Sequence, residues 1–230
     1  MPHKSSFVQD AHRAYDLKVE KSLAEHIIEP PYLLVEESPA LEGTVSLAGA
    51  KNAVLVIMLS RILARGVSIL YNVPASDDVY QMIHLLHELG ARIQFDQEEH
   101  TMNIDTTDLD GYRVSLEIMK KMRASVLVMG PLLARFGKVE IALPGGDVIG
   151  DRPVDIHIKN FEKMGVTVEQ NGDFLTAHVK HLQHRNLLLE YPSVGATENL
   201  LMLAVLTKGT TRIINAALEP EVFDLIIALR

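Results

Sequence analysis

Residues whose types and spacing could bind an anion lie in four short segments, 46–52, 122–125, 143–155 and 191–199. Three of these segments begin a predicted helix directly after a glycine or a polar turn. A helix N-terminus offers unpaired N–H groups and the positive end of the helix dipole, and therefore favours phosphate and carboxylate. Lys51, Arg123 and Arg152 would add three cations at these ends. The pattern predicts a site for a small polyanion.

Taken singly, each segment also has a purely structural interpretation. Arg123 and Arg152 are typical of surface salt bridges. The run Leu-Pro-Gly-Gly-Asp at 143–147 is a good turn, because proline presets φ and glycine accepts positive φ. The run Ser-Val-Gly at 193–195 fits a tight strand-to-helix turn, with Thr197 as an N-cap. The joint occurrence of the segments, and not any one of them, indicates a binding site.

The composition excludes several classes of protein and site. Lys+Arg 22 against Asp+Glu 30 gives a net charge of -8, whereas a nucleic-acid surface would need a basic face. The chain has no cysteine, which excludes disulfides, thiolate metal sites and a thiol nucleophile. The histidine pairs at 84/87 and 181/184 lack the further ligands that a zinc site needs. No dinucleotide-binding or phosphate-loop motif is present. We predict neither a metal nor a cofactor.

Nothing in the sequence indicates a membrane protein. Residues 1–20 are charged throughout and lack the apolar centre of a signal peptide. The longest apolar runs, such as 54–59, are much shorter than a membrane span. We therefore expect a cytoplasmic protein. Residues 1–31 are polar and end at Pro30-Pro31, which would stop a helix, so we interpret them as a partly helical or disordered extension without chemistry.

From Tyr32 onward the elements that must position these segments repeat. Helical runs end near Gly66, Gly137 and Gly209, which are 71 and 72 residues apart, and each glycine leads into an alternating strand. We predict each as a helix C-cap. In the same phase, helices end before Gly90 and Gly165, and strands follow them. The predicted α/β unit is strand-helix-strand-helix-strand-strand, over roughly 70 residues.

The third unit is incomplete in this sequence. Its second helix is predicted to begin near Glu219 and is still running at Leu229-Arg230. Two further strands would follow by the repeat. We therefore expect residues 32–230 to be most of one domain in a longer protein, with an exposed apolar face on this last helix.

Five motifs occur together in the chain. They are Ala-Gly-Ala-Lys-Asn-Ala at 48–53, Met-Arg-Ala-Ser at 122–125, Gly-Pro-Leu-Leu-Ala-Arg-Phe-Gly at 130–137, Leu-Pro-Gly-Gly-x-x-Ile-Gly-x-Arg-Pro-Val-Asp at 143–155, and Ser-Val-Gly-Ala-Thr-Glu-Asn at 193–199. Together they resemble the UDP-N-acetylglucosamine 1-carboxyvinyltransferase family, the enolpyruvyl transferases of peptidoglycan synthesis. The related shikimate branch usually has Asp-Lys-Ser where this chain has Ala-Lys-Asn, which makes it the poorer match.

The resemblance implies a fold and an activity. The family fold is an inside-out α/β barrel, with two similar domains that each hold three repeated units around buried helices. The active site lies in the cleft between the domains, so this chain would need a second domain to complete it. The implied reaction transfers the enolpyruvyl group of phosphoenolpyruvate to the 3-hydroxyl of UDP-N-acetylglucosamine, and phosphate leaves.

The resemblance also implies residue roles. Lys51 and Asn52 match the pair that contacts phosphoenolpyruvate, and Arg123 matches a substrate-binding arginine. The nucleotide-sugar site would be lined by one continuous segment, Arg152, Pro153, Val154, Asp155 and Ile156. The turn beside the UDP phosphates would be Ser193, Val194 and Gly195. Tyr191 stands where many relatives have lysine, which argues against a charged contact at that position.

The largest departure from the family is Asp147, because most relatives carry a cysteine there and a minority carry aspartate. That cysteine is the general acid and the target of the epoxide antibiotic fosfomycin. A free aspartate has a pKa of about 3.9, so a proton donor here would need desolvation and nearby substrate anions to raise it. We predict that Asp147 is the proton donor and that the protein is insensitive to fosfomycin.

Two other functions are compatible with the same sequence. The chain could be a catalytically inactive paralogue that only binds nucleotide sugar. It could also be an interaction fragment that docks a partner protein through residues 1–31. The retained Lys51-Asn52 pair and the Arg-Pro-Val-Asp run at 152–155 favour an enzyme. Without the second domain, we expect the isolated chain to be inactive.

Overall fold

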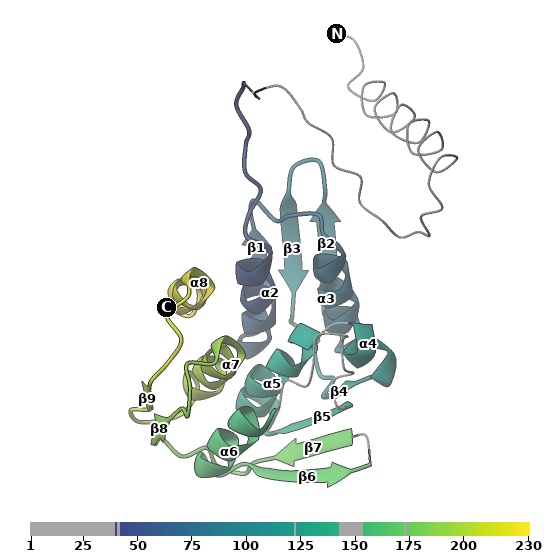
Figure 1. Cartoon of the computed structure of the whole chain (residues 1–230). Helices are drawn as coiled ribbons and strands as arrows, with labels where there is room; N and C mark the ends of the chain where they lie inside the picture. The colour runs from purple at the N-terminus through teal and green to yellow at the C-terminus, as the bar shows by residue number, and fades with distance from the viewer. Residues whose placement is uncertain (1–39, 41, 122, 143–153, 173) are drawn as a thin grey trace, which may run out of the picture. The chain divides into compact units, whose positions relative to one another are not determined.

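A computed structural model describes residues 40, 42–121, 123–142, 154–172 and 174–230, with the main chain alone at 120, 121 and 123–125. The larger compact unit, which contains all the helices and strands below, is Leu47–Arg230. Its elements are shown in Figure 1. The predicted extension at 1–31 lies outside the described residues.

The first repeat contains helices α2 (Lys51–Ser60) and α3 (Asp77–Glu88) and an antiparallel sheet. The short 3-10 helix η1 (Arg61–Leu63) follows α2, and the strands are β1 (Val67–Leu70), β2 (Arg92–Asp96) and β3 (Thr101–Asp105). The strand order is β1-β3-β2. Residues 42–50, just before α2, form no strand. Most of the chain between Tyr32 and residue 41 lies outside the described residues, so the predicted first strand of this unit stays a prediction.

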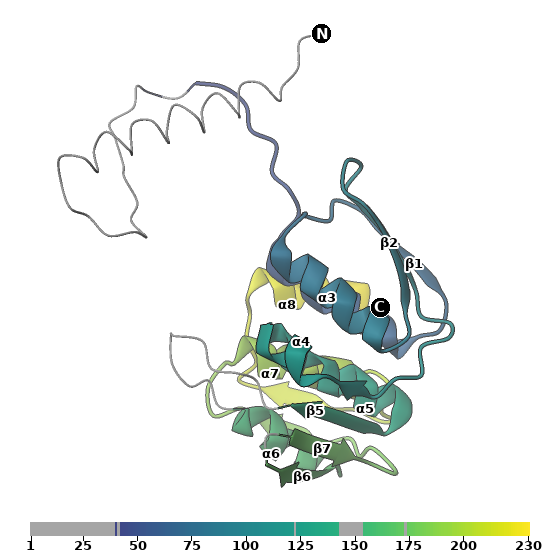
Figure 2. The same cartoon turned by 90° about the vertical axis from the view of Figure 1, so that its right-hand side faces the viewer.

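The second repeat shows the full predicted order. Its elements are β4 (Arg113–Val114), α4 (Leu116–Lys121), the 3-10 helix η2 (Arg123–Val128), α5 (Met129–Phe136), β5 (Lys138–Ala142), α6 (Asp155–Lys163), β6 (Thr167–Asn171) and β7 (Phe174–His178). The sheet order is β4-β5-β7-β6, with β4 parallel to β5 and the other pairs antiparallel. Figure 2 shows this sheet beneath α4 and α5, and the β1-β3-β2 sheet beside α3.

The third repeat has the same order as far as it extends. It consists of β8 (Asn186–Leu188), α7 (Val194–Ala204), β9 (Arg212–Ile214) and α8 (Pro220–Ala228). β8 and β9 pair in parallel, with Leu187 opposite Ile213, as β4 and β5 do. The predicted start of the last helix near Glu219 is confirmed, because Glu219 is the N-cap of α8.

The three repeat glycines share a backbone conformation but not a position in the helix. Gly66, Gly137 and Gly209 all have positive φ, at 133°, 71° and 101°. Gly137 is the C-cap of α5, as predicted. The other two lie past the ends of η1 and α7, so their prediction as C-caps was wrong. They occupy the turn into the next strand, where the left-handed conformation is still required.

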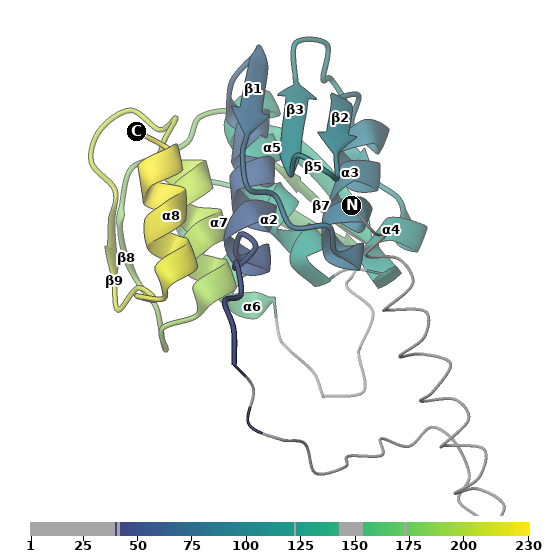
Figure 3. The same cartoon turned by 90° about the horizontal axis from the view of Figure 1, so that it is seen from above.

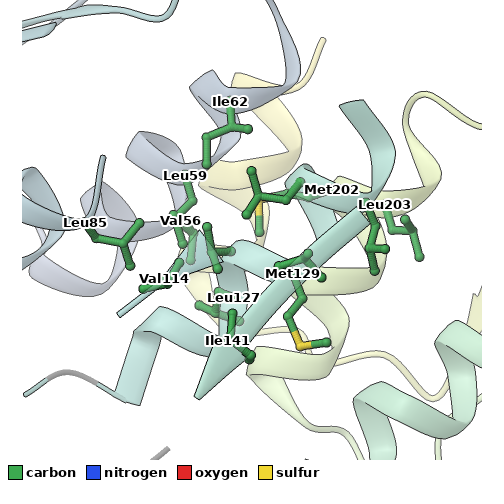
Figure 4. Close-up of a cluster of buried hydrophobic side chains, with 14 of the residues drawn as sticks. Val56, Leu59, Ile62, Leu85, Val114, Leu127, Met129, Ile141, Met202 and Leu203 are labelled. Carbon is green, nitrogen blue, oxygen red and sulfur yellow. The ribbon is translucent and has the colours of Figure 1, made fainter. Parts of the chain in front are cut away.

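Helices α2 and α7 form the centre of the unit. Nearly every side chain of α2 from Ala53 to Ser60 is buried, and α7 is buried from Ala196 to Leu200. A helix that is apolar all round must be enclosed by other elements, which explains why neither has a solvated face. Figure 4 shows their contribution to the core, where Val56, Leu59 and Met202 lie among side chains of α3, α5 and β5.

Helices α2, α7 and α8 run in the same direction, side by side (Figure 3). Arginine side chains tie the ends of helices from different repeats. Arg61 donates to the carbonyl of Ala228 at 2.8 Å, which joins the first repeat to the third. Arg135 donates to the carbonyls of Ile62 at 2.8 Å and Thr106 at 3.1 Å, which joins the second repeat to the first. The bonds to Ala228 and Ile62 satisfy carbonyl groups at helix ends, and the bond to Thr106 adds the segment that follows β3.

The outer face of α8 is apolar and exposed. Val222 and Leu225 are buried against the unit, whereas Phe223 and Ile227 are 51% and 68% exposed. The expected exposed apolar face on this helix is therefore present. None of the helices in the described ranges has the length and apolarity that a membrane crossing requires.

Candidate functional site

The starts of α2, α7 and α8 meet at one end of the unit. Asn52, at the start of α2, donates from Nδ2 to Oε1 of Glu221 in α8 at 3.4 Å. The amide of Ala217, just before α8, donates to Oγ1 of Thr197 in α7 at 3.0 Å. The N-termini of these three helices therefore lie together.

The start of α7 also contacts α6 and η2. A Cβ atom added to Gly195 would lie 3.6 Å from Cε1 of His157 in α6 and 3.5 Å from Cδ2 of Leu127 in η2. Both distances are ordinary van der Waals contacts. The turn at Ser193–Gly195 thus packs directly on the helix that begins with Asp155, and two segments that are 40 residues apart in the sequence form one surface.

Lys51 is the first residue of α2, and a carboxylate partners it. Its Nζ lies 2.6 Å from Oδ2 of Asp78 at the start of α3, and both side chains are partly exposed. Just before the helix, Gly49 lies so close to the carbonyl of Asn72 that any side chain at 49 would collide with it. The close approach fixes the direction in which the chain enters α2. The Lys51 cation is therefore presented at the surface in a defined position.

Ser193, and not Thr197, is the N-cap of α7. The hydroxyl of Ser193 accepts a hydrogen bond from the amide of Ala196 at 3.3 Å. Thr197 lies within the first turn, where its hydroxyl donates to the Ser193 carbonyl at 2.8 Å and accepts from Ala217. The prediction of Thr197 as N-cap was wrong, because α7 already begins at Val194. The Thr197 hydroxyl instead joins α7 to the segment before α8.

Glu198 is a buried carboxyl group in α7, with 3% of its surface exposed. Burial, and then the nearby carboxylates Glu221 and Glu219, raise its pKa to about 8. Glu198 is therefore mostly protonated and neutral at pH 7, and it adds little negative charge near Glu221.

Asn199 is fully buried and bridges several elements. Its Oδ1 accepts from the amide of Gly130 in α5 at 2.6 Å. Its Nδ2 lies 3.1 Å from the carbonyl of Val126 in η2 and 3.0 Å from Nδ1 of His157 in α6. Burial lowers the pKa of His157 to about 4, although Asp155 opposes the shift, so the imidazole is neutral at pH 7.

The structure places eight of the predicted site residues. They are Lys51, Asn52, Val154, Asp155, Ile156, Ser193, Val194 and Gly195. Asp155 is exposed at the start of α6, whereas the Ile156 side chain is buried in the core. Arg123 begins η2, which gives its main-chain position. The predicted Asp147, Arg152 and Pro153 lie outside the described residues.

Sequence reasoning missed five residues at this end of the unit: Asp78, His157, Glu198, Asn199 and Glu221. One signal was available for two of them. Thr197, Glu198 and Asn199 are three consecutive polar residues in an otherwise apolar helix, so they must be buried and need partners. In the part of the chain that the structure describes, no group of three or more His, Asp or Glu side chains is placed to hold a metal ion.

Comparison with known proteins identifies relatives for most of the chain. The family model of EPSP synthase (3-phosphoshikimate 1-carboxyvinyltransferase) matches residues 35–230. A UDP-N-acetylglucosamine 1-carboxyvinyltransferase of Symbiobacterium thermophilum is 45% identical over 189 residues, which are 80% of this chain and 43% of that protein. The enzyme of the same name from Wolbachia sp. subsp. Brugia malayi is 45% identical over 196 residues, 83% of this chain and 46% of that protein. This chain spans less than half the length of these relatives.

Solved structures show the same fold at lower identity. The enolpyruvyl transferase NikO from Streptomyces tendae has a TM-score of 0.73 and 19% identity, and the match covers 83% of this chain and 44% of that one. An EPSP synthase from Acinetobacter baumannii has a TM-score of 0.64 and 14% identity, over 79% of this chain and 42% of that one.

Proposed function

Because the chain belongs to the EPSP synthase family of enolpyruvyl transferases, we propose that it forms the substrate-binding half of a UDP-N-acetylglucosamine 1-carboxyvinyltransferase. The α/β fold of the enolpyruvyl transferases that we predicted is the fold of its solved relatives. The substrates would be UDP-N-acetylglucosamine and phosphoenolpyruvate, which the relatives' name implies.

One observation carries the proposal beyond family membership. The turn at Ser193–Gly195 packs on the start of α6, where Asp155 is exposed. These are the two segments expected to bind the nucleotide sugar. The main-chain N–H groups and the positive dipole ends at the starts of α6 and α7 favour the negative charge of a diphosphate. The contact between the two segments supports a single site that spans both.

Phosphoenolpyruvate would bind at the start of α2. Lys51 provides a partly exposed cation there, and Asn52 provides an amide that can donate to an anionic oxygen. Asp147 would protonate C3 of phosphoenolpyruvate while the sugar 3-hydroxyl attacks C2, and phosphate would then leave the adduct. We propose that a second domain supplies the remaining charged residues. A cytoplasmic location fits the absence of cysteine.

Isothermal titration of the 230-residue chain with UDP-N-acetylglucosamine tests the proposal. We expect saturable binding, which Arg152→Ala weakens because the variant lacks a cation beside the diphosphate. Arg92→Ala is the matched control, because Arg92 pairs with Asp105 and Asp108 on the β1-β3-β2 sheet. An absence of saturable binding by the folded chain would contradict the proposal. Equal weakening by both variants would place the ligand elsewhere.

A further inference from the structure

We propose that Asn199 is a positioning residue that fixes three predicted substrate segments against one another, and that neutral His157, protonated at Nε2, is its partner. The segments are η2, which begins with Arg123, the start of α6, and the N-terminal turn of α7. The role in ligand binding rests on the proposed function. The arrangement of hydrogen bonds does not.

The orientation of the Asn199 amide follows from its partners. The Gly130 main-chain N–H can only donate, so the atom of Asn199 that lies 2.6 Å from it must be the acceptor Oδ1. The carbonyl of Val126 can only accept, so the atom 3.1 Å from it must be Nδ2. The two contacts agree on one orientation. In the reversed amide, Nδ2 would face the Gly130 N–H, donor against donor, and Oδ1 would face the Val126 carbonyl, acceptor against acceptor.

This orientation determines the tautomer of His157. Nδ2 of Asn199 lies 3.0 Å from Nδ1 of the imidazole and donates to it, so Nδ1 must carry a lone pair. A neutral imidazole with an unprotonated Nδ1 carries its proton on Nε2. Protonation of Nδ1 would bring two N–H groups together in a buried site, which is costly. The pKa of His157, lowered by burial, agrees with this geometry, and the charge of Asp155 opposes the shift.

The same pair of side chains determines where the α7 turn lies. The His157 ring packs beneath Gly195, where an added Cβ would lie 3.6 Å from Cε1 and 3.8 Å from Nε2. On the other side, Asn199 is held within the helix that this turn begins. Its remaining bonds reach η2 and α5, which are 73 and 69 residues away in the sequence. A change at Asn199 therefore shifts three segments together, although it lies in the interior.

Nitrogen NMR of the folded wild-type chain tests the hydrogen bonds without any ligand. We expect the Nδ1 resonance of His157 in the unprotonated range, Nε2 in the protonated range, and no titration of either between about pH 6 and pH 8. The Gly130 amide should also exchange slowly with solvent. The opposite tautomer, or a His157 that titrates in this range, would overturn the assignment.

Substitutions then test the positioning role through UDP-N-acetylglucosamine affinity. His157→Asn places an amide oxygen near the position of Nδ1, whereas His157→Leu leaves Asn199 without that acceptor. We expect His157→Leu to weaken binding by roughly tenfold or more, because displacement of substrate-positioning groups is costly, and His157→Asn to recover most of the loss. Equal effects of the two variants would indicate simple packing and contradict the proposal.

Asn199→Asp provides a separate NMR readout. The carboxylate still accepts from Gly130, but it cannot donate to His157, so the pair is complete only when His157 carries a proton on Nδ1, either as the cation or as the other neutral tautomer. We expect the Nδ1 nitrogen resonance of His157 to move into the protonated range in this variant. An Nδ1 that stays unprotonated in the variant would contradict the role of the pair. If the wild-type chain binds no nucleotide sugar, the proposed function fails, and the NMR result still decides the tautomer and the hydrogen bonds.

Discussion

Nζ of Lys51 and Oδ2 of Asp78 lie 2.6 Å apart, so the cation predicted to bind phosphoenolpyruvate already has an anionic partner within the protein. Both groups are partly exposed, which limits the stability that the pair contributes to less than about 1 kcal/mol. An incoming anion must share Lys51 with Asp78. We therefore expect the pair to affect the affinity for an anionic ligand more than the stability of the fold.

We expect Asp78→Asn to strengthen phosphoenolpyruvate binding by about threefold to tenfold at low ionic strength, because it removes a negative charge beside the site. Titration of the chain with phosphoenolpyruvate measures the effect, which should shrink as salt is added. Asp108→Asn, at an exposed pair with Arg92 of β2, should leave the affinity unchanged. Weaker binding in Asp78→Asn would mean that the carboxylate chiefly holds Lys51 in place.

Glu198 should make stability fall as pH rises. Its folded pKa of about 8 lies above the usual value, so the folded state keeps a proton that the unfolded state releases. The destabilisation begins near pH 4.5, grows by up to about 1.4 kcal/mol per pH unit, and is complete above about pH 8. Glu198→Gln removes this dependence. Urea unfolding should show the variant close to wild type at pH 5 and clearly more stable at pH 9.

Glu169→Gln is a suitable control for Glu198, because Glu169 lies exposed on β6. It should follow the wild-type stability at both pH values. If Glu198→Gln also follows wild type at pH 9, then Glu198 is ionised at little cost, and its burial does not exclude water.

Asp147→Asn in the complete two-domain protein should abolish turnover, because the amide cannot give a proton to C3 of phosphoenolpyruvate. Phosphate release with both substrates measures the activity, and UDP-N-acetylglucosamine affinity shows whether the site is intact. Wild-type protein should resist covalent inactivation by fosfomycin, since a carboxylate forms no thioether. Unchanged turnover in Asp147→Asn would exclude this residue as the proton donor.

Gly130→Ala should destabilise the chain by roughly 1–3 kcal/mol. The added Cβ would collide with the main-chain carbonyl and the side-chain oxygen of Asn199, and both belong to a closely packed pair of helices. Gly195→Ala tests the same change where the space is adequate, and helix propensity should make it neutral or stabilising by up to about 1 kcal/mol. Thermal unfolding compares the two. Equal losses would show that the interface between α5 and α7 can relax.

The repeat was predictable from sequence because its signals are local. Glycines at the turns, alternating residues in β5 and the uniformly apolar run in α2 each report on a few neighbouring residues. Residues 42–50 show the limit of such local signals. They alternate as a strand would but form no strand, because a strand exists only where another strand pairs with it.

The candidate site was predictable in part for the same reason. Motifs such as Ser-Val-Gly at 193–195 mark helix starts, which are local features. The bonds of Asn199 span 42 to 73 residues, and the pairing of Lys51 with Asp78 depends on how α2 and α3 cross. Such contacts depend on the packing of elements that are distant in the sequence. A buried polar residue indicates that a partner exists, but not which residue it is.

The arginine bonds at the helix ends affect how the unit comes apart. In an array whose repeats contact only their neighbours, one end can unravel while the remainder stays folded. Here Arg61 of the first repeat holds the last turn of α8 in the third, and Arg135 of the second holds η1 in the first. Loss of the first or the second repeat therefore leaves a carbonyl group in another repeat without its arginine donor, and loss of the third removes an acceptor of Arg61. We expect the three repeats to unfold in a single cooperative transition, with similar hydrogen-exchange protection for the central amides of α2, α5 and α7.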